Sequence, residues 1–224
     1  MLEQGSSHTA GVLDPTIPVD IGARSQRQRI IEAMIESCAE KTYAATTIAD
    51  IVKRAGISRT TFYKRFPNKR ACFDGALAFC LDALREAAVE SYGASDPPPQ
   101  ALRKAAAAML ELLAARPAMA QLVMGDAIMV EPAIGERYRE WIVSGVAGLW
   151  EATDPPRPFA DPGLAFGRAQ VLVFSQIAAG RADRLPELLP EIVYIALLPL
   201  AGHEEAVQQA QIAGDHGSNG SAPR

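Results

Sequence analysis

The sequence has few of the residues on which most catalytic and redox chemistry depends. Its 224 residues include only three cysteines and three histidines. His8, His203 and His216 lie in or near the two ends of the chain. No paired-carboxylate, Ser/His/Asp or Cys/His arrangement is visible in the sequence. These absences argue against an enzyme, so we expect no catalytic residue, no metal site and no cofactor.

The three cysteines also lack the pattern of a metal or disulfide framework. Cys38, Cys72 and Cys80 are odd in number, show no metal-ligand spacing and occupy apolar positions of helical patterns. We expect buried, reduced thiols of the kind found in the cytoplasm, and a redox or metal role is the alternative.

Long apolar runs are missing as well. Residues 1–23 contain no apolar stretch of the length that a signal peptide needs. The longest apolar stretch, residues 192–198, is far shorter than the ~20 residues that cross a bilayer. We therefore expect a cytoplasmic protein that does not enter a membrane.

No segment alternates polar and apolar residues as a half-buried strand does, and the chain has no internal repeats. Helical periodicity recurs instead, and the fold class is predicted to be all-α. The predicted helices lie near residues 25–41, 47–55, 58–66, 69–91, 100–115, 117–130, 132–153, 163–182 and 190–206.

Residues 46–73, TTIADIVKRAGISRTTFYKRFPNKRACF, predict two short helices joined by a tight turn. Thr47 can cap the first helix, and Asp50 occupies the reciprocal position of a capping box. Gly56 follows the last apolar position, where a left-handed residue commonly ends a helix. Ser58 then caps the next helix within three residues. So short a connection between two helices is typical of a helix-turn-helix.

The second of these helices is predicted to have two different faces. Phe62 and Phe66 are four residues apart and point inward, whereas the opposite face mixes cations, hydroxyls and a phenol. Arg can pair with guanine edges, while Lys, Tyr and Thr contact phosphates or base edges. The alternative is an ordinary solvated pair of charged helices. The predicted DNA-contacting residues are Thr47, Ser58, Arg59, Thr60, Thr61, Tyr63, Lys64 and Lys69.

Charge is distributed in agreement with this interpretation. The whole chain has a net charge of −4. Residues 20–76, however, hold 11 Lys and Arg against 6 Asp and Glu, a net of +5. The positive field is thus concentrated around the predicted helix-turn-helix.

These residues resemble the N-terminal DNA-binding signature of the tetracycline-repressor (TetR) family of bacterial transcriptional regulators. Two positions depart from the signature: Thr60 stands where many members have Gly, and Cys72 where Leu is usual. Thr60 adds a side chain at the predicted DNA face, so relatives do not specify the operator. The matching residues are Thr47, Ile48, Ala49, Ala55-Gly56-Ile57-Ser58, Thr61-Phe62-Tyr63, Phe66 and Lys69.

The resemblance implies a division of the chain into a small DNA-binding domain and a larger helical regulatory domain. We expect a flexible arm in residues 1–23 and a helix-turn-helix domain in residues 24–70. A helical ligand-binding and dimerisation domain should follow in residues 71–206. Residues 207–224, polar and rich in Gly and Ser, are predicted to be a disordered tail.

The last two predicted helices are apolar around most of their circumference, so each must be covered on two sides. One side faces the subunit's own core, and a second subunit is the simplest cover for the other. Proteins of the resembled family dimerise through such a C-terminal four-helix bundle. The predicted interface residues are Ala169, Val173, Ile195 and Leu198.

Four of the six methionines fall within residues 109–129, close to several aromatic residues. Met side chains repack easily around an apolar guest, although an ordinary helical core would look the same. The resemblance is what makes a ligand pocket expected here. Its predicted lining residues are Phe79, Met109, Met124, Tyr138, Trp141 and Phe174.

Together these observations predict a homodimeric transcriptional regulator, a repressor that leaves a palindromic operator when a small apolar or amphipathic effector binds. The alternative is a helix-turn-helix regulator whose larger domain binds a protein partner or no ligand.

Overall fold

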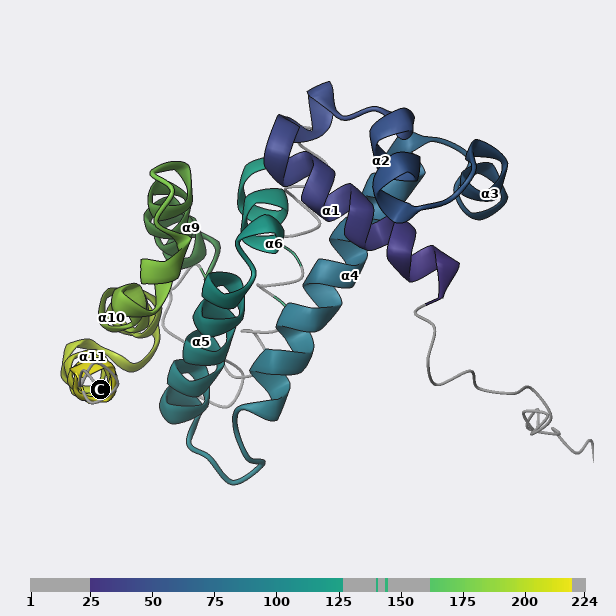
Figure 1. Cartoon of the computed structure of the whole chain (residues 1–224). Helices are drawn as coiled ribbons and strands as arrows, with labels where there is room; N and C mark the ends of the chain where they lie inside the picture. Colours follow the sequence, from purple (N-terminus) through teal and green to yellow (C-terminus); the bar gives the residue numbers. More distant parts are fainter. Residues whose placement is uncertain (1–24, 127–139, 141–143, 145–161, 219–224) are drawn as a thin grey trace, which may run out of the picture.

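The computed structural model describes residues 25–126, 140, 144 and 162–218, and all its elements in these ranges are helices (Figure 1). This confirms the all-α fold. The elements are α1 (Gln26–Ala45), α2 (Ile48–Ala55), α3 (Arg59–Arg65), α4 (Lys69–Glu90), α5 (Pro98–Ala115), α6 (Pro117–Gln121), the π-helix η1 (Leu122–Asp126), α9 (Pro162–Ala178), the 3-10 helix η2 (Ala182–Leu188), α10 (Leu189–Ala201) and α11 (His203–Ser218).

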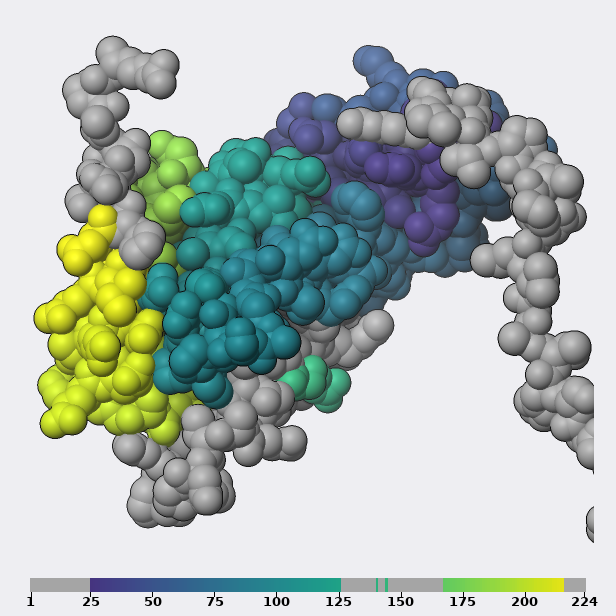
Figure 2. Space-filling model, turned by 90° about the horizontal axis from the view of Figure 1, so that it is seen from below, coloured from purple at the N-terminus to yellow at the C-terminus, as the bar shows by residue number. Residues whose placement is uncertain are grey.

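The helices are arranged along one long direction. Helices α1, α2 and α3 gather at one end, and α4 leads away from them beside α5 (Figure 1). Helix α10 packs on α5 and lies between α9 and α11. Seen from below, the purple α1 end and the yellow α11 end are on opposite sides of the molecule (Figure 2).

A single hydrophobic cluster joins the two ends. Near α1 it contains Ile30 and Met34, and along α4 it contains Phe73 and Leu84, all fully buried. The cluster continues into the C-terminal helices, where Val193 of α10 is buried. Helix α4 therefore packs both against α1 and against α5.

The C-terminal region differs from the sequence prediction. Helix α10 ends at Gly202, which has φ 89°, and α11 then runs through residues that we expected to form a disordered tail. Helix α11 packs along α10 and buries Ala206, Gln209 and Ala213. Arg103 Nε of α5 donates to Gln209 Oε1 at 2.9 Å, which ties α11 to the larger domain. Helix α11 is thus polar on its exposed side, and its buried side packs against α10 and α5.

Other predicted boundaries shift by smaller amounts. Helix α1 extends to Ala45 across a break at Thr42, and α6 gives way to η1 after Gln121. The predicted helix at residues 132–153 lies outside the described residues apart from 140 and 144. Among the described residues no single helix is long and apolar enough to cross a membrane. One pair of consecutive helical segments, Pro98–Ala115 and Pro117–Gly125, has the length and composition of a membrane span when taken together, but the pair is bent by 108°.

The three cysteines are buried thiols that form no disulfide, as predicted. Burial raises the pKa of the Cys72 thiol to about 12, and it does the same for Cys80. Because the thiolate is the reactive form, both groups are poor nucleophiles at neutral pH.

Candidate nucleic-acid interface

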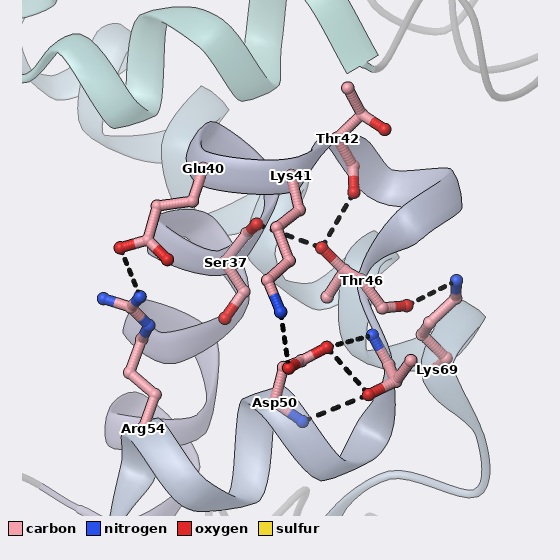
Figure 3. Close-up of polar contacts among 9 residues, drawn as sticks. Ser37, Glu40, Lys41, Thr42, Thr46, Asp50, Arg54 and Lys69 are labelled. Atoms are coloured by element: carbon pink, nitrogen blue, oxygen red, sulfur yellow. Dashed lines mark hydrogen bonds and ion pairs between the residues drawn. The ribbon is translucent and has the colours of Figure 1, made fainter.

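The start of α2 is fixed by the capping box that the sequence predicts (Figure 3). Thr47 Oγ1 accepts from the backbone N–H of Asp50 at 3.2 Å, and Asp50 Oδ2 accepts from the backbone N–H of Thr47 at 2.9 Å. Lys41 donates to Asp50 Oδ1 at 2.7 Å. The hydrogen bond from Lys41, together with those from Thr47, holds the pKa of the Asp50 carboxyl well below its usual range. The cap therefore stays charged at neutral pH.

The turn between α2 and α3 is equally well specified. Gly56 adopts a left-handed conformation with φ 65°, and its N–H donates to the carbonyls of Val52 and Lys53. Ser58 Oγ accepts from the N–H of Thr61 at 3.1 Å and lies 3.0 Å from Thr61 Oγ1. These two predicted DNA contacts thus have a structural task, since their hydroxyls help to start α3.

Helix α3 separates its residues into two faces. Phe62 is fully buried and Phe66, at the C-cap, is nearly so, with ring centroids 6.0 Å apart. Tyr63 is 53% exposed, an unusual position for a large aromatic side chain. The exposed residues of this helix are Arg59, Thr60, Tyr63, Lys64 and Arg65. We call Arg59, Thr60, Tyr63 and Lys64 the α3 face.

Two contacts hold α3 against α1. The guanidinium of Arg27 lies over the Phe66 ring, 5.3 Å from its centroid, and Arg65 donates to Gln26 Oε1 at 3.3 Å. Arg65 was not among the predicted site residues, although its position next to Lys64, in a helix rich in exposed cations, could have indicated it. These contacts fix the orientation of the α3 face relative to the rest of the domain.

Some other cations near the motif have carboxylate partners. Arg54 pairs with Glu40, and Arg70 pairs with Asp74 at 2.9 Å. Arg59 and Lys64, by contrast, form no ion pair with another described residue. Their N–H donors therefore remain available to phosphate oxygens or to acceptors on base edges.

Lys69 lies differently from the sequence expectation. Its Nζ donates to the backbone carbonyls of Tyr43 and Thr46 at 2.9 Å each, and it stands 4.2 Å from the centroid of the Tyr43 ring. The positive charge of Lys69, at the start of α4, thus lies against the carbonyl end of α1, where a cation is favourable. Of the predicted contacts, Thr47 and Ser58 cap helices and Thr61 bonds to the Ser58 cap. Lys69 contacts the end of α1, and the remaining four residues form the α3 face.

The predicted ligand-binding residues are only partly brought together. Met124 is buried, and Phe79 and Met109 are half-buried against the same core. Phe174 instead lies on the outer side of α9 and is 44% exposed. Tyr138 and Trp141 fall outside the described residues. The structure thus places Phe174 on a surface, away from the core positions of the other three.

The predicted dimer residues also divide. Val173 is 5% exposed and belongs to the subunit's own core, whereas its neighbour Val171 is 66% exposed. Ala169, Ile195 and Leu198 are half-buried. Because α9 is apolar on nearly every side, periodicity alone could not distinguish the inward position from the outward one.

Comparison with known proteins agrees with this geometry. Residues 30–76, which contain α2, α3 and the start of α4, match the family model of bacterial regulatory proteins of the tetR family. Residues 30–76 thus carry the DNA-binding domain of the TetR family. TetR-family proteins are transcription factors and not enzymes, which agrees with the absence of a catalytic arrangement in the sequence.

Curated relatives match only part of this chain. An uncharacterised helix-turn-helix regulator, YerO of Bacillus subtilis, is 33% identical over 90 residues, which are 38% of this chain and 30% of YerO. The nucleoid occlusion factor SlmA of Vibrio cholerae is 24% identical over 119 residues, 53% of this chain and 59% of SlmA. The chain thus spans less than two thirds of the length of these relatives.

Solved structures share the whole fold. FadR from Bacillus subtilis, solved with stearoyl-CoA, superposes with a TM-score of 0.65 at 19% identity and covers 78% of this chain and 98% of FadR. A gamma-butyrolactone receptor gives 0.60 at 21% identity, covering 85% and 97%. A TetR-like regulator from Rhodococcus sp. RHA1 gives 0.63 at 19% identity, covering 79% and 96%. The shared fold therefore covers most of the chain and is not confined to the helix-turn-helix.

Proposed function

We propose that this protein is a homodimeric, sequence-specific DNA-binding regulator that represses transcription until a small apolar or amphipathic effector releases it from a palindromic operator. The observation that carries the DNA-binding part is the α3 face. Phe62 and Phe66 bury the opposite side, so Arg59, Thr60, Tyr63 and Lys64 are presented together. In a helix-turn-helix the N-terminal residues of the second helix contact base edges in the major groove.

The four residues divide into two kinds of contact. Arg59, at the first position of α3, is suited to pair with guanine through its two parallel N–H groups. Thr60 lies beside it at the start of the helix. Lys64 and Tyr63, further along, are suited to phosphate oxygens, which fix the register of the protein on the duplex.

The dimer is supported by an apolar stripe on α9. Gly167, Val171, Phe174 and Ala178 follow one another at intervals of four, three and four residues, which places them on one side of a helix. Val171 and Phe174 are the large exposed members, and a Cβ at Gly167 would meet nothing within 4 Å. A second copy of the chain would cover this stripe. In this proposal Val171 and Phe174 take the place of Val173.

The stripe continues toward the neighbouring helix. Ile195 and Leu198 of α10 are half-exposed, and α9 and α10 are in contact. We include these two residues in the dimer interface together with Ala169. A dimer built on two helices per subunit would present two α3 faces, and two half-sites about one helical turn apart would follow.

The effector is proposed to be apolar or amphipathic. Met119 and Met124 are buried near η1, and adaptable Met side chains suit an apolar guest. A solved relative holds stearoyl-CoA and another is a gamma-butyrolactone receptor, so acyl chains and lactones are the first compounds to test. The alternative, a larger domain that binds a protein or nothing, predicts no effect of such compounds.

Selection from a pool of random DNA duplexes tests the proposed function. The purified protein should enrich a palindrome, and its binding should weaken with salt. If a dimer neutralises ~6 phosphates, the logarithm of the association constant should fall with the logarithm of salt at a slope near −5. A pool that shows no enrichment after repeated rounds would contradict sequence-specific binding.

A further inference from the structure

The outward side of α9 carries a charge beside its apolar stripe. Arg168 is exposed and lies three residues before Val171 and seven before Ser175, which places the three residues on one side of the helix. Phe174, a large exposed apolar residue, is on this side as well. Arg168 forms no ion pair and no hydrogen bond with any other residue that the structure describes. A guanidinium that a second copy of the chain covers needs a carboxylate from that copy.

Helix α10 carries the complementary charge. Glu191, Ile195 and Leu198 follow one another at intervals of four and three residues, so they share the side of α10 that faces away from the buried Val193 and Leu197. Glu191 is exposed, and no described cation pairs with it. Helices α9 and α10 are in contact and lie on the side of the molecule away from α4 (Figure 1). Their outward sides thus combine apolar residues with one unpaired cation and one unpaired anion.

The charges in the connection between α9 and α10 do not supply these partners. Arg181 Nε donates to Gln176 Oε1 at 2.8 Å, and Arg184 pairs with Glu187 at 2.6 Å. Asp183 is exposed, but it belongs to η2, which packs on α5. The unpaired cation of α9 and the unpaired anion of α10 also form no ion pair with each other inside the subunit.

We infer that Arg168 of one subunit pairs with Glu191 of the other across the dimer interface. The inference rests on the proposed homodimer. In a two-fold dimer, a contact of residue i with residue j of the partner is repeated as a contact of j with i. Each dimer therefore contains two identical pairs, and a surface with one Arg and one Glu is complementary to itself.

The two pairs give the interface a selectivity that its apolar residues lack. Hydrophobic contact is not directional, so it does not distinguish one register of the helices from another, or a second copy of this chain from the apolar surface of a related regulator. A wrong register or a wrong partner leaves the guanidinium unpaired or brings like charges together, which is unfavourable. Arg168 and Glu191 are thus the specificity-determining residues of self-association.

Charge reversal tests the pair in the full-length protein. Arg168→Glu and Glu191→Arg each turn two attractions per dimer into two repulsions, and we expect each to weaken the dimer about 100-fold, or about 2.8 kcal/mol over the two pairs. The double variant restores opposite charges and should dimerise like the wild type. Asp183→Arg, a reversal at an exposed carboxylate of η2, is the matched control and should leave dimerisation unchanged. Sedimentation velocity over a concentration series measures the dissociation constants, and circular dichroism confirms that each variant is folded.

Mixing the two single variants shows whether the pair joins different subunits. A dimer of one Arg168→Glu subunit with one Glu191→Arg subunit has opposite charges at both pairs, whereas each homodimer has like charges at both. With a peptide tag on one variant, native mass spectrometry counts the species. The heterodimer should greatly exceed the one half that random association gives.

A random ratio of species in the mixture, or a double variant no stronger than the single ones, would overturn the inference. Rescue of Arg168→Glu by Asp183→Arg in place of Glu191→Arg would overturn it as well. If a reversal variant does not fold, Arg168→Gln and Glu191→Gln take its place: each should weaken the dimer, and the two together should weaken it no more than one alone. A wild type that sediments as a monomer would contradict the proposed homodimer itself, and that result precedes any comparison of variants.

Discussion

Replacing Thr42 by glycine should make the protein more stable. Thr42 has φ 70° and ψ 159° inside α1, and it is the one described residue other than glycine with a positive φ. This part of conformational space is essentially restricted to glycine, because a β-branched side chain collides with the backbone there. The strain persists because the corner is held by other bonds, among them that of the Thr46 hydroxyl to the Thr42 carbonyl at 2.8 Å.

The magnitude follows from two opposing contributions. Relief of the strained backbone should stabilise the folded state by about 1–3 kcal/mol. Glycine also makes the unfolded chain more flexible, which offsets about 0.4–1 kcal/mol. Thr42 is exposed, so little packing is lost. We expect a net gain of about 1–2 kcal/mol, or a melting temperature higher by about 2–8 °C for a chain of this size.

Urea unfolding followed by circular dichroism measures this difference. Ala44→Gly is the matched control, since Ala44 is exposed in the same turn without a positive φ, and it should be destabilised by about 0.5–1 kcal/mol. A Thr42→Gly protein no more stable than the wild type would refute the reasoning, because it would mean that the backbone at residue 42 carries no strain.

Three further predictions concern the dimer, the capping box and the effector. Val171→Glu should yield folded monomers in analytical ultracentrifugation, because an unpaired charge buried in the dimer interface costs about 3–5 kcal/mol. Val173→Glu should instead unfold the subunit, since it places the charge in the subunit's own core. A Val171→Glu protein that remains dimeric would contradict the proposed interface. The depressed pKa of Asp50 means that its stabilising effect is complete above the ordinary carboxyl pKa of 3.8 and is lost as pH falls toward the folded value. The stability difference between wild type and Asp50→Asn, from urea titrations, should therefore shrink below pH 3.8, and a constant difference would count against the charged cap. Acyl-CoA or lactone compounds that raise the melting temperature should lower operator affinity on the order of 100-fold, if the coupling free energy between effector and operator binding is ~3 kcal/mol. A compound that stabilises the protein and leaves operator affinity unchanged would not be an effector.

The helix-turn-helix could be predicted from the sequence because its signals are local. Thr47 and Asp50 are three residues apart, Gly56 follows its helix directly, and Asn68 caps α4 through the N–H of Ala71. Each of these contacts joins residues within one turn. Sequence spacing therefore determines them almost completely.

The contacts of Lys69 could not be predicted in this way. Its two carbonyl partners lie 23 and 26 residues earlier in the chain, and only the packing of α4 against α1 brings them together. The outward-facing side of α9 could not be predicted either, since a helix that is apolar on nearly every side gives no periodic signal to separate the exposed Val171 from the buried Val173. Helix α11 was missed for its polar composition, although Gly202 followed by Glu204 and Glu205 is a recognisable helix boundary.

The most direct test of the central claim compares the DNA sequences selected by two proteins that differ only on the α3 face. Wild type and Arg59→Ala are each taken through selection from the same pool of random duplexes, and the enriched motifs are sequenced. The account predicts that wild type enriches a palindrome and that Arg59→Ala loses preference at one base pair of each half-site, by ~1–3 kcal/mol. Identical motifs from the two proteins would contradict the claim that the α3 face recognises DNA sequence through Arg59.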